Sequence, residues 1–230
     1  MKLARARYFP LGVVVVLACL PAAAQRGELM TIARTFKTNL EQLQSYSWTQ
    51  RMEVQVNGEV TELTLSHVRY DLDGKLQKTP IKETEEKKVR GPIRKKRAKK
   101  QRKKTNEFNQ DLRDLILTYT QFTPQQMHSV FDRAGIFPGV GDSAGMLRVQ
   151  AHGVVREGDW MYIWADEVTK RLRKIEIRTS LEGQPINVVT EFRDLTDGPT
   201  YAARTIVKTE SKGKPMVITS ENFDFIRQGG

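Results

Sequence analysis

The sequence predicts an α+β protein whose main element is a strongly curved antiparallel sheet of about nine or more strands, wrapped around helices. Two observations lead to this prediction. Stretches of alternating apolar and polar residues are joined by short turn sequences such as Asn57-Gly58 and Lys212-Gly213-Lys214, and short connections produce antiparallel neighbours. Only about two helical surfaces accompany the strands, so the sheet must curl to bury its apolar faces.

The first part of the chain predicts one helix followed by three strands. Apolar residues recur about every 3.6 positions over residues 27–44, which indicates an amphipathic helix. Alternation predicts strands over residues 46–56 and 60–70, joined into a hairpin by the Asn57-Gly58 turn. A short third strand is expected to end before Pro80.

The second part predicts two helices and then six strands. No residue forbids a helix from Pro92 to Phe122, and a second, short helix would begin at Thr123-Pro124 and stop at Gly135. From Met146 onward the pattern is that of strands separated by short turns. The six strands are predicted over residues 146–156, 159–166, 171–180, 185–194, 201–210 and 215–225.

Residues 1–24 are typical of a secretory signal peptide. Basic residues precede a short apolar run over 11–18, and small residues lead up to Ala24. The run is far shorter than the roughly 20 residues of a spanning helix. Cleavage after Ala24 would leave residues 25–230 as a single periplasmic domain. The alternative is a lipobox at Val16-Leu17-Ala18-Cys19, which would make the protein an outer-membrane lipoprotein through Cys19.

One segment carries almost the whole positive charge of the chain. The formal net charge is +11, and residues 82–104 hold 13 basic and three acidic side chains. We expect a long basic helix or arm, inserted at about 82–106, that contacts an anionic membrane surface or lipopolysaccharide. A solvated projection is the alternative, and nucleic acid is an unlikely partner because no aromatic residue interleaves with the charges. The residues expected to contact the anionic surface are Arg94, Lys95, Lys96, Arg97, Lys99, Lys100, Arg102, Lys103 and Lys104.

Two strands carry aromatic residues at alternate positions. Side chains two residues apart share a face of a strand, so each set could face a concavity. Large aromatic side chains either fill a core or line an apolar groove for a ligand, and the sequence leaves both readings open. The candidate groove residues are Tyr46, Trp48, Met52 and Val54 on one strand, and Trp160, Tyr162 and Trp164 on another.

No sequence motif indicates catalysis, a metal or a cofactor. The chain has three histidines and one cysteine, with no metal-binding spacing and no phosphate-binding loop. Asp159, Asp166 and Glu167 are separated acids around a hairpin, which favours solvated turn residues over an acid and base pair. We therefore expect a protein that is not an enzyme.

The residues from Leu29 to Phe36 with Leu40, followed by Ser45-Tyr46-Ser47-Trp48-Thr49-Gln50, resemble the helix and aromatic first strand of a known family. This is the periplasmic lipoprotein-carrier superfamily of LolA, LolB and RseB. The resemblance extends over the element order of nearly the whole mature chain. It implies an open barrel whose apolar concave face holds acyl chains under a cover of helices, without covalent chemistry.

The function expected from these observations is that of a non-enzymatic, exported carrier that binds lipids or lipoproteins in the bacterial cell envelope. Its partners would be acyl chains or a lipoprotein, and an anionic surface. The alternative is an envelope regulatory or scaffold module that binds another protein through its curved sheet.

Overall fold

The computed structural model describes residues 22–71, 73–83, 108, 110–112, 114–116, 118, 119, 130–211 and 213–228. These residues form one bounded α-helix, ten strands and one short 3-10 helix. The elements are α1 (Ala22–Leu43), β1 (Tyr46–Val56), β2 (Glu59–Tyr70), β3 (Leu76–Glu83), β4 (Gly135–Pro138), η1 (Gly141–Ser143), β5 (Met146–His152), β6 (Trp160–Asp166), β7 (Leu172–Leu181), β8 (Gln184–Asp194), β9 (Thr200–Ser211) and β10 (Lys214–Arg227).

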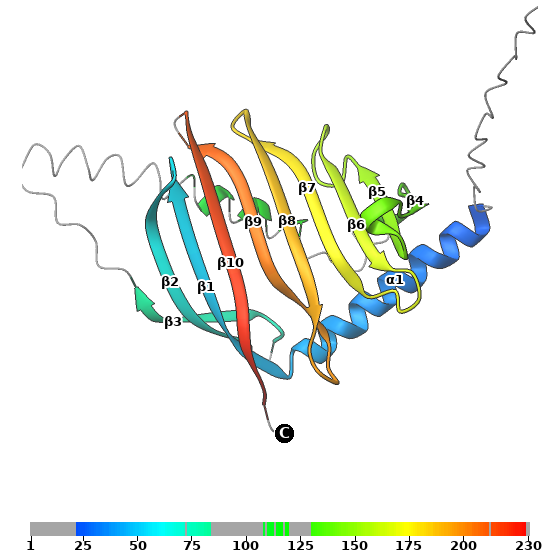
Figure 1. Cartoon of the computed structure of the whole chain (residues 1–230), viewed down its shortest axis with the longest axis horizontal. Helices are drawn as coiled ribbons and strands as arrows, with labels where there is room; N and C mark the ends of the chain where they lie inside the picture. The colour runs from blue at the N-terminus through cyan, green and yellow to red at the C-terminus, as the bar shows by residue number, and fades with distance from the viewer. Residues whose placement is uncertain are drawn as a thin grey trace, which may run out of the picture.

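All ten strands belong to one antiparallel sheet with the order β3-β2-β1-β10-β9-β8-β7-β6-β5-β4 (Figure 1). Strands β1 to β3 and β4 to β10 each pair with their neighbours in sequence, and β10 joins the two groups by pairing with β1. The two ends of the sheet, β3 and β4, do not pair with each other. The predicted open, unclosed antiparallel sheet is therefore confirmed.

Tight turns with left-handed backbone conformations join several of the strands. At the β1–β2 turn Asn57 has φ 54° and Gly58 has φ 81°, the conformation that a type I′ hairpin requires at both positions. The β7–β8 turn repeats this arrangement, with φ 51° at Glu182 and φ 77° at Gly183. The turn chemistry read from the sequence thus produces the expected antiparallel neighbours.

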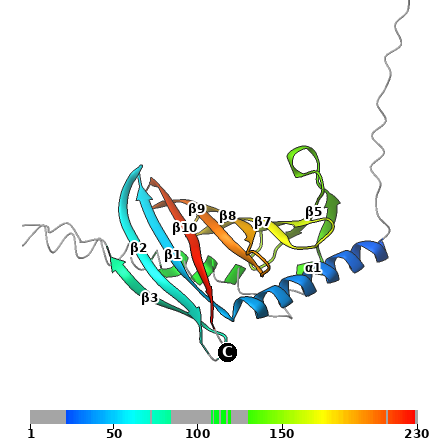
Figure 2. The ribbon, with the colours of Figure 1, turned by 60° about the horizontal axis from the view of Figure 1, so that its bottom comes forward.

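The sheet is strongly curved, and its concave face is covered by helices. Figure 2 shows β1, β2 and β3 bent away from the plane of β5 to β8, with α1 and further helical turns on the inner side. Register shifts interrupt the pairing of β1 with β10, β6 with β7 and β8 with β9. Such irregularities increase the local twist and bend a sheet. We call the covered side the concave face and the opposite side the outer face.

Helix α1 packs against the concave face through the apolar stripe that the sequence predicted. Leu29 and Ile32 are buried in the main core, and Ala33 and Phe36 are partly buried against it. Leu43, at the end of the helix, is buried near the start of β1. The helix begins at Ala22 and ends at Leu43, close to the expected range of 27–44.

Helical residues between positions 108 and 119 complete the core. Leu112, Leu115 and Tyr119 are buried, and Phe108 and Ile116 pack partly buried against the same cluster. The apolar face predicted for the second half of the 92–122 helix is therefore present at these positions. The basic part of that prediction, at about 82–106, lies outside the described residues except for the end of β3.

Two local predictions were wrong. Strand β3 does not end before Pro80 but runs through it to Glu83, which is tolerated because β3 is an edge strand with no ladder partner on one side. The pairing of β2 with β3 shifts between Leu65 and Ser66, opposite Pro80. Gly135 was expected to stop a helix, but it begins β4, which pairs with β5.

The helical segments in the described part of the chain were also compared with the requirements for crossing a bilayer. None of them combines the necessary length with sufficient apolar character.

Replacing Ile32 by alanine should lower the free energy of unfolding by about 2–5 kcal/mol, because the side chain is fully buried between α1 and the sheet. The matched control is Met30→Ala on the same helix, where the side chain is 39% exposed and the change should stay within about 0.5 kcal/mol. Urea unfolding followed by circular dichroism measures both. Equal losses for the two variants would contradict the packing of α1 described above.

Candidate functional site

The concave face carries a continuous row of apolar side chains. Strand pairing aligns one residue from each of seven adjacent strands across the curved sheet. Most of these side chains are buried in the main core, and Ile218 is partly buried against it. The row consists of Val54, Ile218, Val207, Val188, Ile177, Met161 and Ala151. A neighbouring row is mixed, because Met52 pairs with Ser220, which pairs with Thr205.

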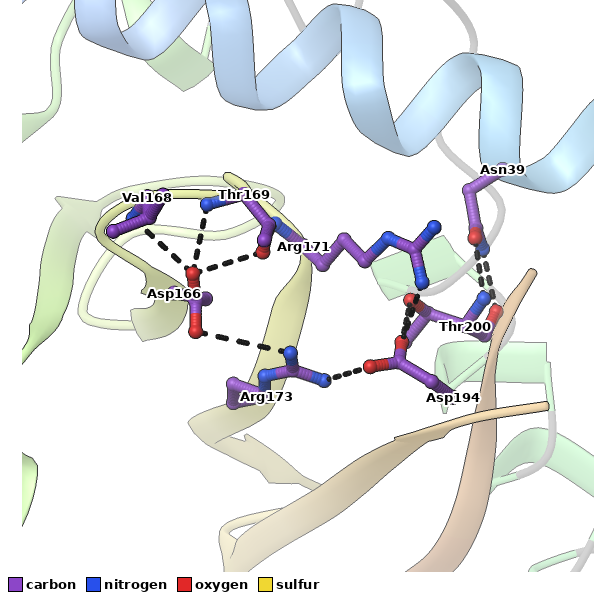
Figure 3. A network of polar contacts seen from close by, with 8 residues as sticks. All are labelled: Asn39, Asp166, Val168, Thr169, Arg171, Arg173, Asp194 and Thr200. Carbon is purple, nitrogen blue, oxygen red and sulfur yellow. Dashed lines mark hydrogen bonds and ion pairs between the residues drawn. The ribbon is translucent and has the colours of Figure 1, made fainter. Parts of the chain in front are cut away.

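Two polar contacts hold α1 at the rim of the concave face. The Asn39 side chain accepts a hydrogen bond from the Thr200 backbone N–H and donates one to the Thr200 carbonyl oxygen, both at 2.5 Å (Figure 3). Near the start of the helix, the Lys170 ammonium lies 2.5 Å from a Glu28 carboxylate oxygen. We call these two contacts the rim latch.

Next to Asn39, four charged residues from three strand ends form a network (Figure 3). Asp194 lies 2.7 Å from Arg173 and 3.2 Å from Arg171, and it accepts a hydrogen bond from the Thr200 hydroxyl. Burial alone would raise the pKa of Asp194, but these partners outweigh it, so that the pKa lies below its usual value. Because Thr200 contacts both Asn39 and Asp194, the network ties the rim latch to the sheet.

Asp166 forms the other end of this network. It accepts hydrogen bonds from the backbone N–H groups of Thr169 (2.7 Å) and Val168 (3.1 Å). These bonds, those from Thr169 first, lower the pKa of Asp166, and Arg173 at 3.8 Å adds to the effect. Asp166 therefore shapes the β6–β7 turn that carries Lys170 to its contact with Glu28.

A small cleft opens between α1 and the ends of β7, β8 and β9. Its volume is about 220 Å³. It is lined by Thr35, Phe36, Asn39, Arg171, Leu172, Phe192 and Thr200. Part of the 220 Å³ is open solvent, and the space that a water-sized sphere can occupy is about 10 Å³. This is room for roughly one water molecule, so with α1 in its present position the cleft is not a ligand pocket.

Tyr119 anchors the other covering helix to the sheet. Its hydroxyl donates a 2.5 Å hydrogen bond to the Asp159 carboxylate and lies 3.0 Å from the Thr179 hydroxyl. Burial, followed by the contact with Asp159, raises the pKa of the Tyr119 hydroxyl, which therefore remains a donor. The anchor lies at the opposite ends of β6 and β7 from the rim latch.

Asp159 is not a solvated turn residue, contrary to the expectation from the sequence. Its side chain is 1% exposed and accepts hydrogen bonds from the backbone N–H groups of Val154, Val155 and Arg156. Burial alone would raise the pKa of Asp159, but the bonds from Tyr119 and the backbone together lower it. All these partners are structural, so the geometry supports no role as a catalytic acid.

The first set of predicted groove residues lies on the concave face. Tyr46, Trp48, Met52 and Val54 alternate along β1 in register with the apolar row. Trp48 is 7% exposed and stacks on Phe225 at 5.3 Å between ring centroids, with its indole N–H donated to a side-chain oxygen of Asn222. These contacts make Trp48 part of the packed interior, whereas Met52 is only half-buried.

The second set lies on the other side of the sheet. Met161, Ile163 and Ala165 fill the core from β6, so Trp160, Tyr162 and Trp164 point to the outer face. The expectation that both aromatic sets could face one concavity is therefore wrong for these three. In β6 the residues on both faces of the strand are apolar or aromatic. Alternation of apolar and polar residues therefore could not decide which face of the strand points inward.

Sequence reasoning missed Asn39 and Thr200. One signal was present, because Asn39 interrupts the apolar stripe of α1 at a position three residues after Phe36. A polar side chain at such a position needs a hydrogen-bond partner, although the sequence does not say which. The residues predicted to bind an anionic surface, from Arg94 to Lys104, lie outside the described residues. Within the described part of the chain, no cluster of side chains suited to a metal is found.

Acid should weaken the contact between Tyr119 and Asp159, because the pKa of Asp159 lies below its usual value in the folded protein. The stabilisation is fully present above the pKa of an unfolded aspartate, near about 4, and is lost as the pH falls through the folded value. We expect Asp159→Asn to lower the free energy of unfolding by about 1–3 kcal/mol at pH 7. The variant should also lose less stability than the unsubstituted protein when the pH falls from 5 to 2. Urea unfolding across this range measures both effects. The control is Asp142→Asn at an exposed position, which should leave the loss of stability between pH 5 and 2 unchanged. A smaller loss in this variant too would contradict the assignment of the effect to Asp159.

The chain was compared with known proteins. No protein-family model matches it, and no curated protein matches it. Among solved structures, it is similar to a LolA superfamily protein from Nitrosomonas europaea, with 10% sequence identity and a TM-score of 0.39. The similarity covers 84% of this chain and 93% of that one.

Proposed function

We propose that the protein is an exported, non-enzymatic carrier that binds lipids or lipoproteins in the bacterial cell envelope and shelters acyl chains on its concave face. The observation that carries this proposal is the apolar row across seven strands, which is roofed by amphipathic helices and not by a second sheet. A helix is a replaceable cover because its contacts with the sheet are side-chain contacts only.

Helix α1 must move to admit an acyl chain, because the cleft beside it has room for roughly one water molecule, about 10 Å³. Two features keep the free-energy cost of this movement small. The rim latch consists of polar contacts that water can replace, at a net cost of about 0.5–1.5 kcal/mol for each hydrogen bond. The apolar stripe of α1 can be replaced on the sheet by methylene groups, each contributing about 0.8 kcal/mol when buried.

The proposed location is the periplasm, reached through the signal peptide of residues 1–24, with anchoring through Cys19 as the alternative. The basic segment from Arg94 to Lys104 would then hold the carrier near anionic head groups, with about 1 kcal/mol from each basic residue close to the surface. Nucleic acid is not a proposed partner.

The direct test is acyl-chain uptake by the delipidated mature chain. The protein is incubated with a fluorescent fatty acid and separately with bacterial lipid extract, re-isolated by gel filtration and analysed by mass spectrometry. We expect near-stoichiometric acyl chains to co-purify and an unlabelled fatty acid to displace the fluorescent one. Protein that stays empty in both incubations would contradict the carrier function and leave the scaffold alternative.

The role of α1 as a movable cover is tested by Asn39→Ala. The substitution removes both hydrogen bonds to the Thr200 backbone, so fatty-acid uptake should accelerate severalfold while stability falls by about 1–3 kcal/mol. Stopped-flow fluorescence measures the uptake rate. The matched control is Thr38→Ala, an exposed neighbour on the same helix. An unchanged rate in Asn39→Ala, with the stability loss present, would show that α1 belongs to the fixed core.

A further inference from the structure

The outer face of β5, β6 and β7 carries a stack of aromatic rings. His152 lies 4.4 Å from Trp160, Trp160 lies 6.1 Å from Tyr162, and Tyr162 lies 6.0 Å from Trp164, between ring centroids. We call these four residues the aromatic ladder. Figure 1 looks onto this face, and α1 lies on the opposite side of the sheet. The ladder is therefore not the floor of the covered core.

Three cations accompany the ladder. Lys174 lies 4.5 Å from the centre of the Trp164 ring, and Arg178 lies 5.5 Å from that of Tyr162. Arg148 lies 5.5 Å from the ring of Phe137, which is 42% exposed on the adjacent edge strand.

The charges around the ladder are unbalanced. Glu176 is the acid paired with both Lys174, at 3.5 Å, and Arg178, at 2.7 Å. Arg148 makes no ion pair with any residue of the described chain, and its Nε atom is buried without a hydrogen-bond partner there. Glu191 is a second acid on this face, opposite Lys174 in the strand pairing, so three cations stand against two acids and leave a small positive excess.

The remainder of the outer face is different. On β1, β9 and β10, Arg51 pairs with Glu53 and Glu221, and Arg204 pairs with Glu221. These opposite charges neutralise one another on a solvated surface, where ion pairs contribute little to stability. The ladder differs from this paired part of the outer face because its half-buried aromatic rings lie beside cations.

The ring geometry narrows the choice of partner. Trp160 and Tyr162 are nearly parallel, with 9° between their planes. Arg178 and Lys174 lie over the rings of Tyr162 and Trp164, so one face of each of these two rings is occupied. A nucleic acid would need free ring faces on which to stack its bases. The ladder offers ring edges and polar tips beside Lys and Arg, which is the composition that proteins place at a membrane interface.

We propose that the aromatic ladder, together with Arg148, Lys174 and Arg178, docks the protein on an anionic lipid membrane. The ring edges enter the head-group region, and the cations face the lipid phosphates. This surface lies on the opposite side of the sheet from the concave face. The proposal does not depend on the carrier function, because a protein that holds no acyl chain can still dock through its outer face.

Tryptophan fluorescence provides the test, because the chain has three tryptophans and two of them belong to the ladder. The mature chain is titrated with vesicles of 30% phosphatidylglycerol in phosphatidylcholine, and with vesicles of phosphatidylcholine alone. We expect a blue shift with the anionic vesicles only, and quenching when the lipids carry bromine in the upper acyl chain. The third tryptophan, Trp48, is buried on the concave face and should remain unquenched.

The decisive variant is Arg148→Gln with Lys174→Gln. Each cation should contribute about fivefold to vesicle affinity, so the double variant should bind about 25-fold more weakly. The matched control is Arg51→Gln with Arg204→Gln, which removes the same charge from the paired part of the outer face and should leave binding within about twofold. Unfolding midpoints verify that both double variants are folded.

The contribution of the basic segment to vesicle binding must be distinguished from that of the ladder. Each variant is therefore also made with the basic residues from Arg94 to Lys104 changed to Gln. The loss caused by Arg148→Gln with Lys174→Gln should persist in that background. Vesicle binding without tryptophan quenching, or equal losses in the two outer-face double variants, would overturn the proposal. Binding of an anionic polysaccharide in place of the vesicles would overturn it as well.

Discussion

One constraint governs the structure. The broad antiparallel sheet must bury one of its faces, and no second sheet covers that face in the described part of the chain. A flat sheet of ten strands would leave most of the row from Val54 to Met161 exposed to water. Curvature reduces the area to be covered, and two amphipathic helical segments then cover it, through Ile32 on α1 and Leu112 on the other. The register shifts in five strand pairs contribute to the bend, so irregular pairing is part of how this core closes.

The same constraint assigns different roles to polar groups at the two ends of the concave face. At one end, Tyr119 and Asp159 form a buried anchor with every carboxylate contact satisfied, and removing either partner would leave a polar group buried without a hydrogen bond. At the other end, Asn39 contacts only the backbone of Thr200 beside an open cleft. The polar contact at Tyr119 is therefore buried, whereas the one at Asn39 lies at the edge of the cleft.

Much of the architecture could be predicted from the sequence because turns and alternation are local signals. Asn57-Gly58 specifies a hairpin whatever lies around it, and the apolar stripe from Leu29 to Phe36 specifies a helix with one buried face. Pro80 misled the prediction because its effect depends on whether the strand lies at an edge, which is a property of the assembled sheet. Gly135 misled it because a glycine ends helices and begins strands equally well.

The candidate site was predictable only on one of its two strands. In β1 the alternate residues are polar, so Trp48 and Val54 had a single side on which to be buried. In β6 both parities are apolar, and Trp160 could have faced either way. The sequence by itself determined the strands, the turns and the charge of residues 82–104, because these follow from neighbouring residues. Only the tertiary structure decided that Met161 faces the core and Trp160 the outer face, because that choice depends on which side of the finished sheet the helices cover.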